Sequence, residues 1–206
     1  MIQNSKLYIV KLTDLLDELE EEKVKKILKD FDCKYNDDVN FFLHEKAIEF
    51  SKRGFSQTYL VFTSYKNRQV LTGYYAIANK FIRIKDNVKL SKTIKKKLNQ
   101  FVIRDEALKI RIMPCMLIGQ LGKNYNLESK NLIDGKQLLN LACETVRKIQ
   151  MLSGGKFVYL ECEDVDSLVN FYENNGFTEI GRRQLDSDED SLFKQKYLIQ
   201  MIRYLK

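Results

Sequence analysis

Histidine is nearly absent from this chain, and its cysteines are widely spaced. The 206 residues contain one histidine, His44, and no C-x-x-C pair. A zinc site needs closely spaced cysteine and histidine ligands, so the sequence predicts no metal centre. His44 lies on one face of an expected helix, and we do not assign it as a catalytic base. The cysteines lie in apolar or helical surroundings and are expected to be buried thiols: Cys33, Cys115, Cys143 and Cys162.

Proline and long apolar runs are also scarce. One proline and nine glycines leave little room for disordered linkers, so we expect a single domain over residues 1–206. No apolar run approaches the about 18–20 residues that span a bilayer. The start, MIQNSKLYIV, lacks the basic and then apolar pattern of a signal peptide. The sequence therefore predicts a cytoplasmic protein that does not act at a membrane.

Positive charge is in excess. The net charge is +7 and the pI about 9.1, while 44% apolar and 31% charged residues are typical of a globular protein. Residues 80–97 hold eight lysines or arginines against one acid, Asp86. They belong to a lysine-rich insertion at about 80–101, with helical character from Ser91 to Phe101. Such a balance favours anionic partners, although lysine runs are usually solvated surfaces.

The first part of the chain predicts a strand and two helices. Residues 6–12 (KLYIVKL) form the strand. Thr13 is placed to cap the next helix, whose apolar stripe continues to Phe31. A second helix is expected over residues 39–52, ending at Gly54.

The rest of the chain predicts strands separated by helices. Hydrophobic alternation and turn residues set the boundaries. We expect strands at 57–64 and 70–84, the insertion, a strand at 110–123, a helix from 135 to about 152, a strand at 157–163, a helix at 166–175, and strands at 178–183 and 197–205, with an acidic loop at 186–190.

The helix that starts at residue 135 follows a polar loop ending in Asp134-Gly135-Lys136. A helix start presents unpaired N–H groups and the positive end of the helix dipole. Such a start binds phosphate. The next strand and helix carry Phe171-Tyr172 and stop at Asn175-Gly176-Phe177.

This order of elements and motifs resembles the GCN5-related N-acetyltransferases, the GNAT superfamily. The resemblance covers nearly the whole chain. It implies an α/β (α+β) fold with a mixed central sheet of about seven strands, splayed at the middle and flanked by helices. It also implies acetyl-CoA as co-substrate, an amine as acceptor and, since many GNATs pair through their sheets, a homodimer.

The resemblance also assigns a cofactor site. Gln120-Leu121-Gly122-Lys123 occupies the family's strand end, where main-chain groups of Leu121 and Lys123 pair with the pantetheine arm beside a β-bulge. The family's phosphate loop places Lys130 at its first, positively charged position and Ile133 where a glycine usually stands. A plain buried strand and a plain helix cap are the alternatives. The cofactor-binding residues assigned in this way are Leu121, Gly122, Lys123, Lys130, Asn131, Ile133, Asp134, Gly135 and Lys136.

Two residues are assigned to the chemistry. By resemblance, Tyr172 protonates the leaving thiolate, a role that suits a phenol with a pKa of ~10. A helix tyrosine that fills the core is the alternative. Glu161, on the strand beside the slot, is either a general base for the attacking amine or an exposed strand carboxylate. Val165 stands where the family often has an asparagine.

The insertion, Pro114 and Phe171-Tyr172 together look like the toxin GNATs that acetylate aminoacyl-tRNA. That resemblance implies an α-amine acceptor on a tRNA end and an antitoxin partner. The insertion has the right charge to contact phosphates, through Lys92, Lys95, Lys96 and Lys97. A protein or small-molecule amine remains an alternative acceptor. A non-catalytic acyl-CoA-binding or protein-interaction module is the alternative function.

Overall fold

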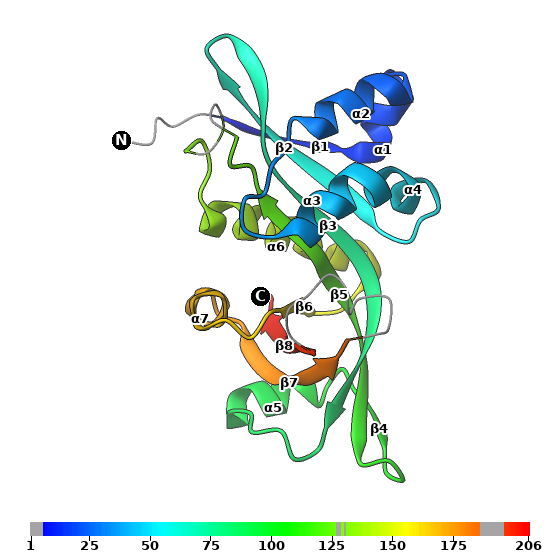
Figure 1. Ribbon diagram of the computed structural model, residues 1–206. Coiled ribbons are helices and arrows are strands. Elements are labelled where there is room, and N and C mark those ends of the chain that lie inside the picture. Colours follow the sequence, from blue (N-terminus) through cyan, green and yellow to red (C-terminus); the bar gives the residue numbers. More distant parts are fainter. Residues whose placement is uncertain (1–5, 127–128, 130, 186–195) are drawn as a thin grey trace. The chain divides into compact units, whose positions relative to one another are not determined.

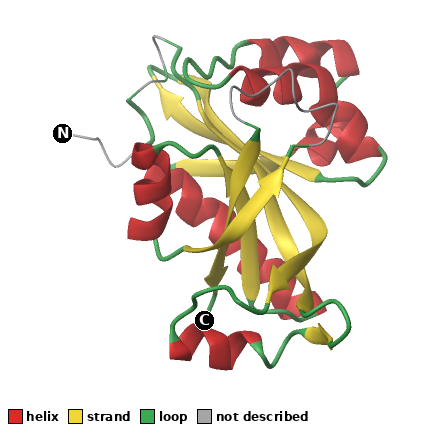
Figure 2. Cartoon of the chain, turned by 60° about the horizontal axis from the view of Figure 1, so that its bottom comes forward, coloured by secondary structure: helices red, strands yellow, loops and turns green. Residues whose placement is uncertain are grey.

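The computed structural model describes residues 6–126, 129, 131–185 and 196–206, which form strands and helices (Figures 1 and 2). The acidic loop predicted at 186–190 lies outside these residues. The strands are β1 Leu7–Lys11, β2 Gln57–Tyr65, β3 Arg68–Lys85, β4 Ile103–Asp105, β5 Ile110–Lys123, β6 Phe157–Cys162, β7 Thr178–Gln184 and β8 Tyr197–Tyr204. The helices are α1 Leu12–Glu18, α2 Glu21–Lys29, α3 Asp37–Phe41, the π-helical turn Phe42–Lys46, α4 Ala47–Lys52, α5 Lys92–Leu98, α6 Gly135–Ser153 and α7 Asp166–Asn174.

The strands form one mixed sheet in the order β1-β2-β3-β5-β6-β8-β7, with β4 beside β5. This confirms the predicted α/β class and mixed sheet. Within the described residues the sheet has eight strands, where about seven were predicted. The additional strand is β4, whose three residues are too few to give a pattern in the sequence.

The chain divides into two compact units. The first comprises Met1–Ala78 and Ile118–Ala142, and the second Asn79–Leu117 and Cys143–Lys206. β3, β5 and α6 each continue from one unit into the other. The single domain over residues 1–206 and the predicted splay between β5 and β6 stay predictions.

In the first unit, β1, β2 and β3 pair in antiparallel fashion. Ile9 lies opposite Val61, and Tyr59 lies opposite Tyr75. The rings of Tyr59 and Tyr75 stack with centroids 5.2 Å apart, a cross-strand contact that helps to fix the register. The register shifts between Val61 and Phe62, which lie opposite Gly73 and Leu71. Thr72 is thus an extra residue in the ladder, and β3 bulges there.

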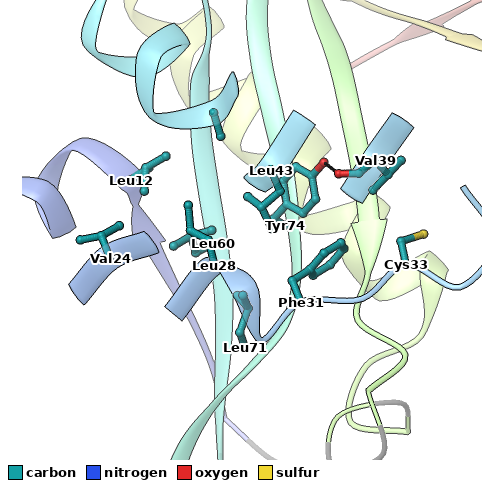
Figure 3. Packing of buried hydrophobic residues seen from close by; sticks show 11 residues of the cluster. Leu12, Val24, Leu28, Phe31, Cys33, Val39, Leu43, Leu60, Leu71 and Tyr74 are labelled. Atoms are coloured by element: carbon teal, nitrogen blue, oxygen red, sulfur yellow. Dashed lines mark hydrogen bonds between the residues drawn. The ribbon is translucent and has the colours of Figure 1, made fainter. Parts of the chain in front are cut away.

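The core of the first unit is built where the apolar stripes of its helices meet β2 and β3 (Figure 3). Tyr74 is fully buried at its centre, and its hydroxyl donates to the Val39 carbonyl oxygen at 2.6 Å. The ring is therefore buried without leaving its polar end unsatisfied. The members are Leu12, Val24, Leu28, Phe31, Cys33, Val39, Leu43, Ala47, Leu60, Leu71 and Tyr74.

The first predicted helix is in fact two helices, α1 and α2, separated at Leu19 and Glu20. Its apolar stripe steps from Leu19 to Val24, a spacing of five residues that a 3.6-residue period does not accommodate. The break lets both halves pack against the same core. The prediction that Thr13 caps this helix was wrong. Helix α1 begins at Leu12, and Lys11 occupies the N-cap position without a side-chain hydrogen bond to the helix.

The second predicted helix is present but contains a π-helical turn. Asn36 caps its start by accepting a hydrogen bond from Val39 N at 3.2 Å. The turn Phe42–Lys46 then carries His44, which is half-buried with its Nε2 3.1 Å from the Phe31 carbonyl oxygen. That contact holds the imidazole against the end of the preceding helix, in a packing role.

In the second unit, β5 and β6 are parallel, with Leu117 opposite Tyr159, whereas the β6–β8 and β7–β8 pairs are antiparallel. The buried side chains of these strands pack with those of β3 and α5 to form a core. Its members are Ile82, Ile84, Leu98, Met113, Cys115, Phe157, Tyr159, Ile180 and Ile202. None of the helices within the described ranges is both long and apolar enough to cross a bilayer.

The lysine-rich insertion packs on this core through α5, as its helical pattern predicted. Ser91 caps the helix by accepting a hydrogen bond from Ile94 N at 3.3 Å. Leu98 is fully buried, and the ring of Phe101 lies 5.9 Å from that of Phe157. The apolar side of α5 is thus held by packing, which leaves its other side to solvent.

Candidate functional site

Helix α6 begins with a reciprocal cap. The Asp134 carboxylate accepts a hydrogen bond from Gln137 N at 2.7 Å, and Gln137 Oε1 accepts one from Asp134 N at 3.0 Å. This capping box leaves the N–H groups of Gly135 and Lys136 without a hydrogen-bond partner among the described residues. Two free amides at the positive end of a helix dipole suit an anion.

Ile133, which precedes α6, does not block this helix start. It stands where the family pattern has a glycine and is only 1% exposed. Its side chain therefore points into the protein and away from the helix start. Asn131 is exposed, whereas Lys130, assigned to the same loop, lies outside the described residues.

Lys123 brings a positive charge to the start of α6. Burial lowers the pKa of Lys123, and the nearby Asp134 carboxylate partly opposes this shift. Lys136, in the first turn of α6, is exposed. The free amides and these two ammonium groups fit the diphosphate of acetyl-CoA, because the adjacent Asp134 carboxylate is already bonded to Gln137.

The end of β5 presents main-chain groups in the direction that the predicted cofactor contacts require. Asn124 N donates to the Thr72 carbonyl oxygen on β3 at 2.9 Å. Successive residues of a strand direct their N–H and C=O groups to opposite sides. The main-chain groups of Leu121 and Lys123 therefore point away from β3.

Gly122 has a packing role that the family pattern did not indicate. A Cβ at this position would lie 2.4 Å from a Val39 carbon, 2.8 Å from Phe31 and 3.0 Å from Tyr74. On the neighbouring strand, a Cβ at Gly73 would lie 2.9 Å from the Gly122 carbonyl oxygen. Glycine at position 122 thus allows α3 and the loop before it to pack closely on β5.

Tyr172 is buried on α7 among apolar groups. Its ring lies 5.7 Å from that of Phe177, and the side chain is 8% exposed. Burial, reinforced by the nearby Cys162 and Cys143 thiols, raises the pKa of Tyr172 well above its usual value. No described residue forms a hydrogen bond with its hydroxyl, so this proton remains available to a ligand.

Glu161 is not the exposed carboxylate that the sequence analysis considered. Arg183 donates to it twice, from Nε to Oε1 at 2.9 Å and from Nη2 to Oε2 at 2.8 Å. The Tyr159 hydroxyl also donates to Oε1, and Gln200 Nε2 donates to that hydroxyl at 2.7 Å. A carboxylate engaged by a guanidinium and a phenol is poorly available as a proton acceptor.

Glu161 and Tyr172 also lie on opposite faces of β6. Side chains alternate along a strand, and Tyr159 and Glu161 contact one another while Cys162 approaches Tyr172. The geometry therefore does not bring the predicted acid and the predicted base together. The base role of Glu161 stays a prediction, and the ion pair with Arg183 favours a structural role.

The insertion lysines differ in their surroundings. Lys92, Lys95 and Lys96 are exposed on α5, whereas Lys97 is half-buried with its Nζ 4.2 Å from the centroid of the Tyr204 ring. The cation–π contact gives Lys97 a packing role. The other three lysines remain available to an anionic partner.

Little negative charge is left in the insertion to balance these lysines. Its single acid, Asp86, accepts a hydrogen bond from Arg104 Nη2 at 3.0 Å. Arg111, which is almost fully buried, places its Nη2 3.0 Å from Asp86 Oδ1 as a charge contact without hydrogen-bond geometry. Asp86 is thus paired with two arginines and does not neutralise the lysines of α5.

Asn124 is a residue that the sequence analysis missed. It is 2% exposed, and its side chain donates to the carbonyl oxygens of Asp30 and Leu71 and accepts from the N–H groups of Asp32 and Asn126. The bonds with Asp30 and Asp32 join the segment after α2 to the end of β5, and the bond with Leu71 joins that end to β3. A polar residue directly after the predicted strand was the only signal for it.

Comparison with known proteins adds evidence at the level of the fold. No protein-family model matches the chain, and no curated protein matches it by sequence. AtaT complexed with acetyl-methionyl-tRNAfMet matches with a TM-score of 0.60 and 19% identity over 94% of each chain. A KacT variant with one tyrosine replaced by phenylalanine matches with a TM-score of 0.60 and 18% identity, again over 94% of each chain. AtaTR bound with AcCoA matches with a TM-score of 0.53 and 18% identity, over 94% of this chain and 91% of the other.

These structures confirm the fold that the sequence predicted. The chain has the GNAT fold, in the form found in the AtaT and KacT toxins. The cofactor-site residues described above lie in the first unit, and Tyr172, Glu161 and the α5 lysines lie in the second.

Proposed function

We propose that this protein is an acetyl-CoA-dependent N-acetyltransferase. A neutral amine attacks the thioester carbonyl directly, so that a C–N bond forms while the C–S bond breaks. Tyr172 donates its phenolic proton to the departing thiolate, and the proton lost by the amine returns to solvent, from which the phenolate is reprotonated. The observation that carries the proposal is Tyr172, a buried residue whose hydroxyl has no hydrogen-bond partner among the described residues.

The raised pKa of Tyr172 is compatible with proton transfer to the CoA thiolate, because that thiolate forms in the same buried surroundings. A phenol with a raised pKa would not protonate an ordinary thiolate, whose conjugate acid has a pKa of about 8.5. Burial, however, raises the pKa of the neighbouring Cys162 thiol to about 12. A cofactor thiolate beside Tyr172 experiences the same desolvation, so its proton affinity approaches that of the phenolate.

The cofactor residues support the same proposal. Gly135, Lys136 and Lys123 hold the diphosphate, while the main chain of Leu121 and Lys123 binds the pantetheine arm. The fold of the chain is that of AtaTR bound with AcCoA, which agrees with this use of the site.

The acceptor that we propose is the α-amino group of an aminoacyl-tRNA. An α-amine with a pKa near 8 is partly neutral at neutral pH, whereas a lysine side chain at ~10.4 needs a base, and Glu161 is engaged by Arg183. Lys92, Lys95 and Lys96 contact phosphates in this proposal. The structure of AtaT with acetyl-methionyl-tRNAfMet supports this acceptor, and that of AtaT with the antitoxin AtaR supports an antitoxin as protein partner. The homodimer remains a proposal from the sequence resemblance.

The chemical step is tested by thiol release from acetyl-CoA with charged tRNA, uncharged tRNA and a panel of peptide and small-molecule amines. Tyr172→Phe should lower kcat by about 10²–10⁴-fold, the usual contribution of a general acid, with little change in the Kd for acetyl-CoA. Tyr8→Phe, on the exposed part of β1, is the matched control and should behave as wild type. A wild-type rate for Tyr172→Phe would remove the acid role.

The acceptor is tested by charge reversal on α5. Lys95→Glu with Lys96→Glu should abolish turnover with charged tRNA but leave thermal stability unchanged. The control is Lys23→Glu with Lys26→Glu, two exposed lysines on α2. Equal activity of both double variants would exclude contacts between the tRNA and α5.

A non-catalytic acyl-CoA-binding module is the second candidate. The Glu161 carboxylate, the predicted base, is engaged by Arg183, and this is the observation that favours the module. Thermal stabilisation by acetyl-CoA without thiol release for any amine in the panel would support this module and overturn the enzyme.

A further inference from the structure

Four residues of the first unit form a group at the surface, of which Lys34 and Tyr35 are exposed and Lys123 and Tyr125 are half-buried. Tyr35 lies in the loop between α2 and α3, and Tyr125 follows β5. Their rings make an edge-to-face contact with centroids 4.8 Å apart. Lys123 Nζ lies 5.1 Å from the Tyr125 centroid, and Lys34 Nζ lies 5.9 Å from the Tyr35 centroid. We call Lys34, Tyr35, Lys123 and Tyr125 the tyrosine–lysine cluster.

Tyr35 is unusually open for an aromatic residue. It is 72% exposed, although Tyr125 beside it is half-buried. One edge of its ring is packed, and most of its surface meets water. An aromatic surface flanked by two cations is the combination on which proteins stack a base and neutralise its phosphates.

The cluster is held in place by the loops that carry it. Tyr125 N donates to the Asp32 carbonyl oxygen at 2.7 Å, and Asn124 accepts from Asp32 N at 3.1 Å. These bonds connect the loop of Tyr35 to the end of β5. The two segments that carry the rings are therefore held together before any ligand arrives, which lowers the entropy cost of binding.

The cluster adjoins the start of α6. Lys123 belongs to it and also interacts with the Asp134 carboxylate that caps this helix. A ligand whose phosphates bind the free amides of Gly135 and Lys136 would extend past Lys123 towards Tyr125. This proximity favours a nucleotide that carries both a base and a phosphate group at that helix.

We propose that the tyrosine–lysine cluster binds the adenosine end of the CoA co-substrate, with the adenine stacked on Tyr35 and with Lys34 and Lys123 facing its phosphates. The inference rests on the proposed function for the identity of the co-substrate. It adds a binding site on the loop between α2 and α3 to the site at α6.

The binding test uses calorimetry with three probes: CoA, adenosine 3′,5′-bisphosphate, and acetyl-pantetheine, which lacks the nucleotide. Tyr35→Ala should raise the Kd for the first two by roughly 5- to 150-fold, the range that one base–aromatic stack supplies. Acetyl-pantetheine should bind unchanged. Tyr35→Phe keeps the ring and should restore the affinity to within about twofold.

A matched control is available in the second unit. Phe81 is also 72% exposed, and Phe81→Ala should leave all three affinities unchanged. Because the chain has no tryptophan, Tyr35→Trp introduces a unique fluorophore. Adenosine 3′,5′-bisphosphate should quench it on binding, whereas the emission of Phe81→Trp should not respond.

The outcomes separate this inference from the proposed function. Unchanged affinities for CoA and the bisphosphate in Tyr35→Ala would overturn the adenosine site, even if acetyl transfer proceeds. If Tyr35→Ala leaves the CoA affinity unchanged but raises the KM for charged tRNA, then a base of the RNA stacks on Tyr35. That result would also overturn the inference. Bisphosphate binding that depends on Tyr35, without acetyl transfer to any amine, would support the inference and contradict the proposed enzyme.

Discussion

Replacing Glu161 by glutamine distinguishes a general base from a structural ion-pair partner. The change keeps the shape of the side chain and one acceptor oxygen, but removes the charge that faces Arg183. The Glu161 and Arg183 side chains are only 11% and 21% exposed. Removing one partner of a buried pair costs ~3–5 kcal/mol, and the partial exposure of this pair places the loss near ~3 kcal/mol. In a chain of this length, such a loss lowers Tm by roughly 6–12 °C.

The measurement is urea unfolding of Glu161→Gln, Arg183→Met and the double variant. Arg183 makes other contacts as well, so the coupling energy from the cycle, and not either single loss, reports on the pair. We expect each single variant to be destabilised and the double variant to lose less than their sum. kcat/KM per folded molecule should change by less than tenfold.

One result would refute this reasoning. If Glu161→Gln is as stable as wild type but loses about 10²–10⁴-fold in kcat/KM, together with the acidic limb of the pH profile, then Glu161 is a general base. The bidentate contact with Arg183 would then have to open during turnover.

Further predictions concern packing, capping and burial. Gly122→Ala places a Cβ 2.4 Å from a valine carbon and should cost ~1–3 kcal/mol or more in urea unfolding. Gly54→Ala, with open space around it but a φ of +72°, should cost only about 1 kcal/mol, and equal losses would contradict the packing argument. Asp134→Ala removes the cap and should cost ~1 kcal/mol. It also removes a negative charge and frees an amide, so calorimetry should show tighter CoA binding; weaker binding would exclude a phosphate at this helix start. Burial raises the pKa of Cys115 and Cys162 from 9 to about 12. The unfolded chain releases these thiol protons first, so unfolding free energy should fall between pH 9 and 12, and less steeply when both cysteines are alanine.

The elements nearest the proposed chemistry could be predicted from the sequence because they are local. Helix α6 has an apolar face, an acidic cap and a glycine terminator within 22 residues, and β6 is apolar apart from Glu161. Tyr172 was found because a short helix and a glycine turn frame it. The break between α1 and α2 was missed, since each half of the stripe is regular on its own.

The tertiary contacts could not be predicted. Arg183 is 22 positions from Glu161 and lies on β7, which is separated from β6 in the sheet by β8. Nothing in the local pattern pairs the two. The crowding at Gly122 depends on a helix and a loop about 85 residues earlier in the chain, so its glycine looked like a cofactor-loop residue.

The side-chain nitrogen of Asn124 helps to hold the end of β5 in place. Its –NH₂ group faces two carbonyl oxygens, at 3.0 Å and 2.8 Å. Hydrolysis of that amide to a carboxylate would keep the size of the side chain and turn two attractions into two repulsions. The segment after α2 would lose the bond from Asn124 to Asp30 but keep the two bonds through the main chain of Asp32. Deamidation of this residue, a change of one mass unit, would therefore loosen the loop that presents Tyr35 in an ageing molecule whose fold is otherwise intact.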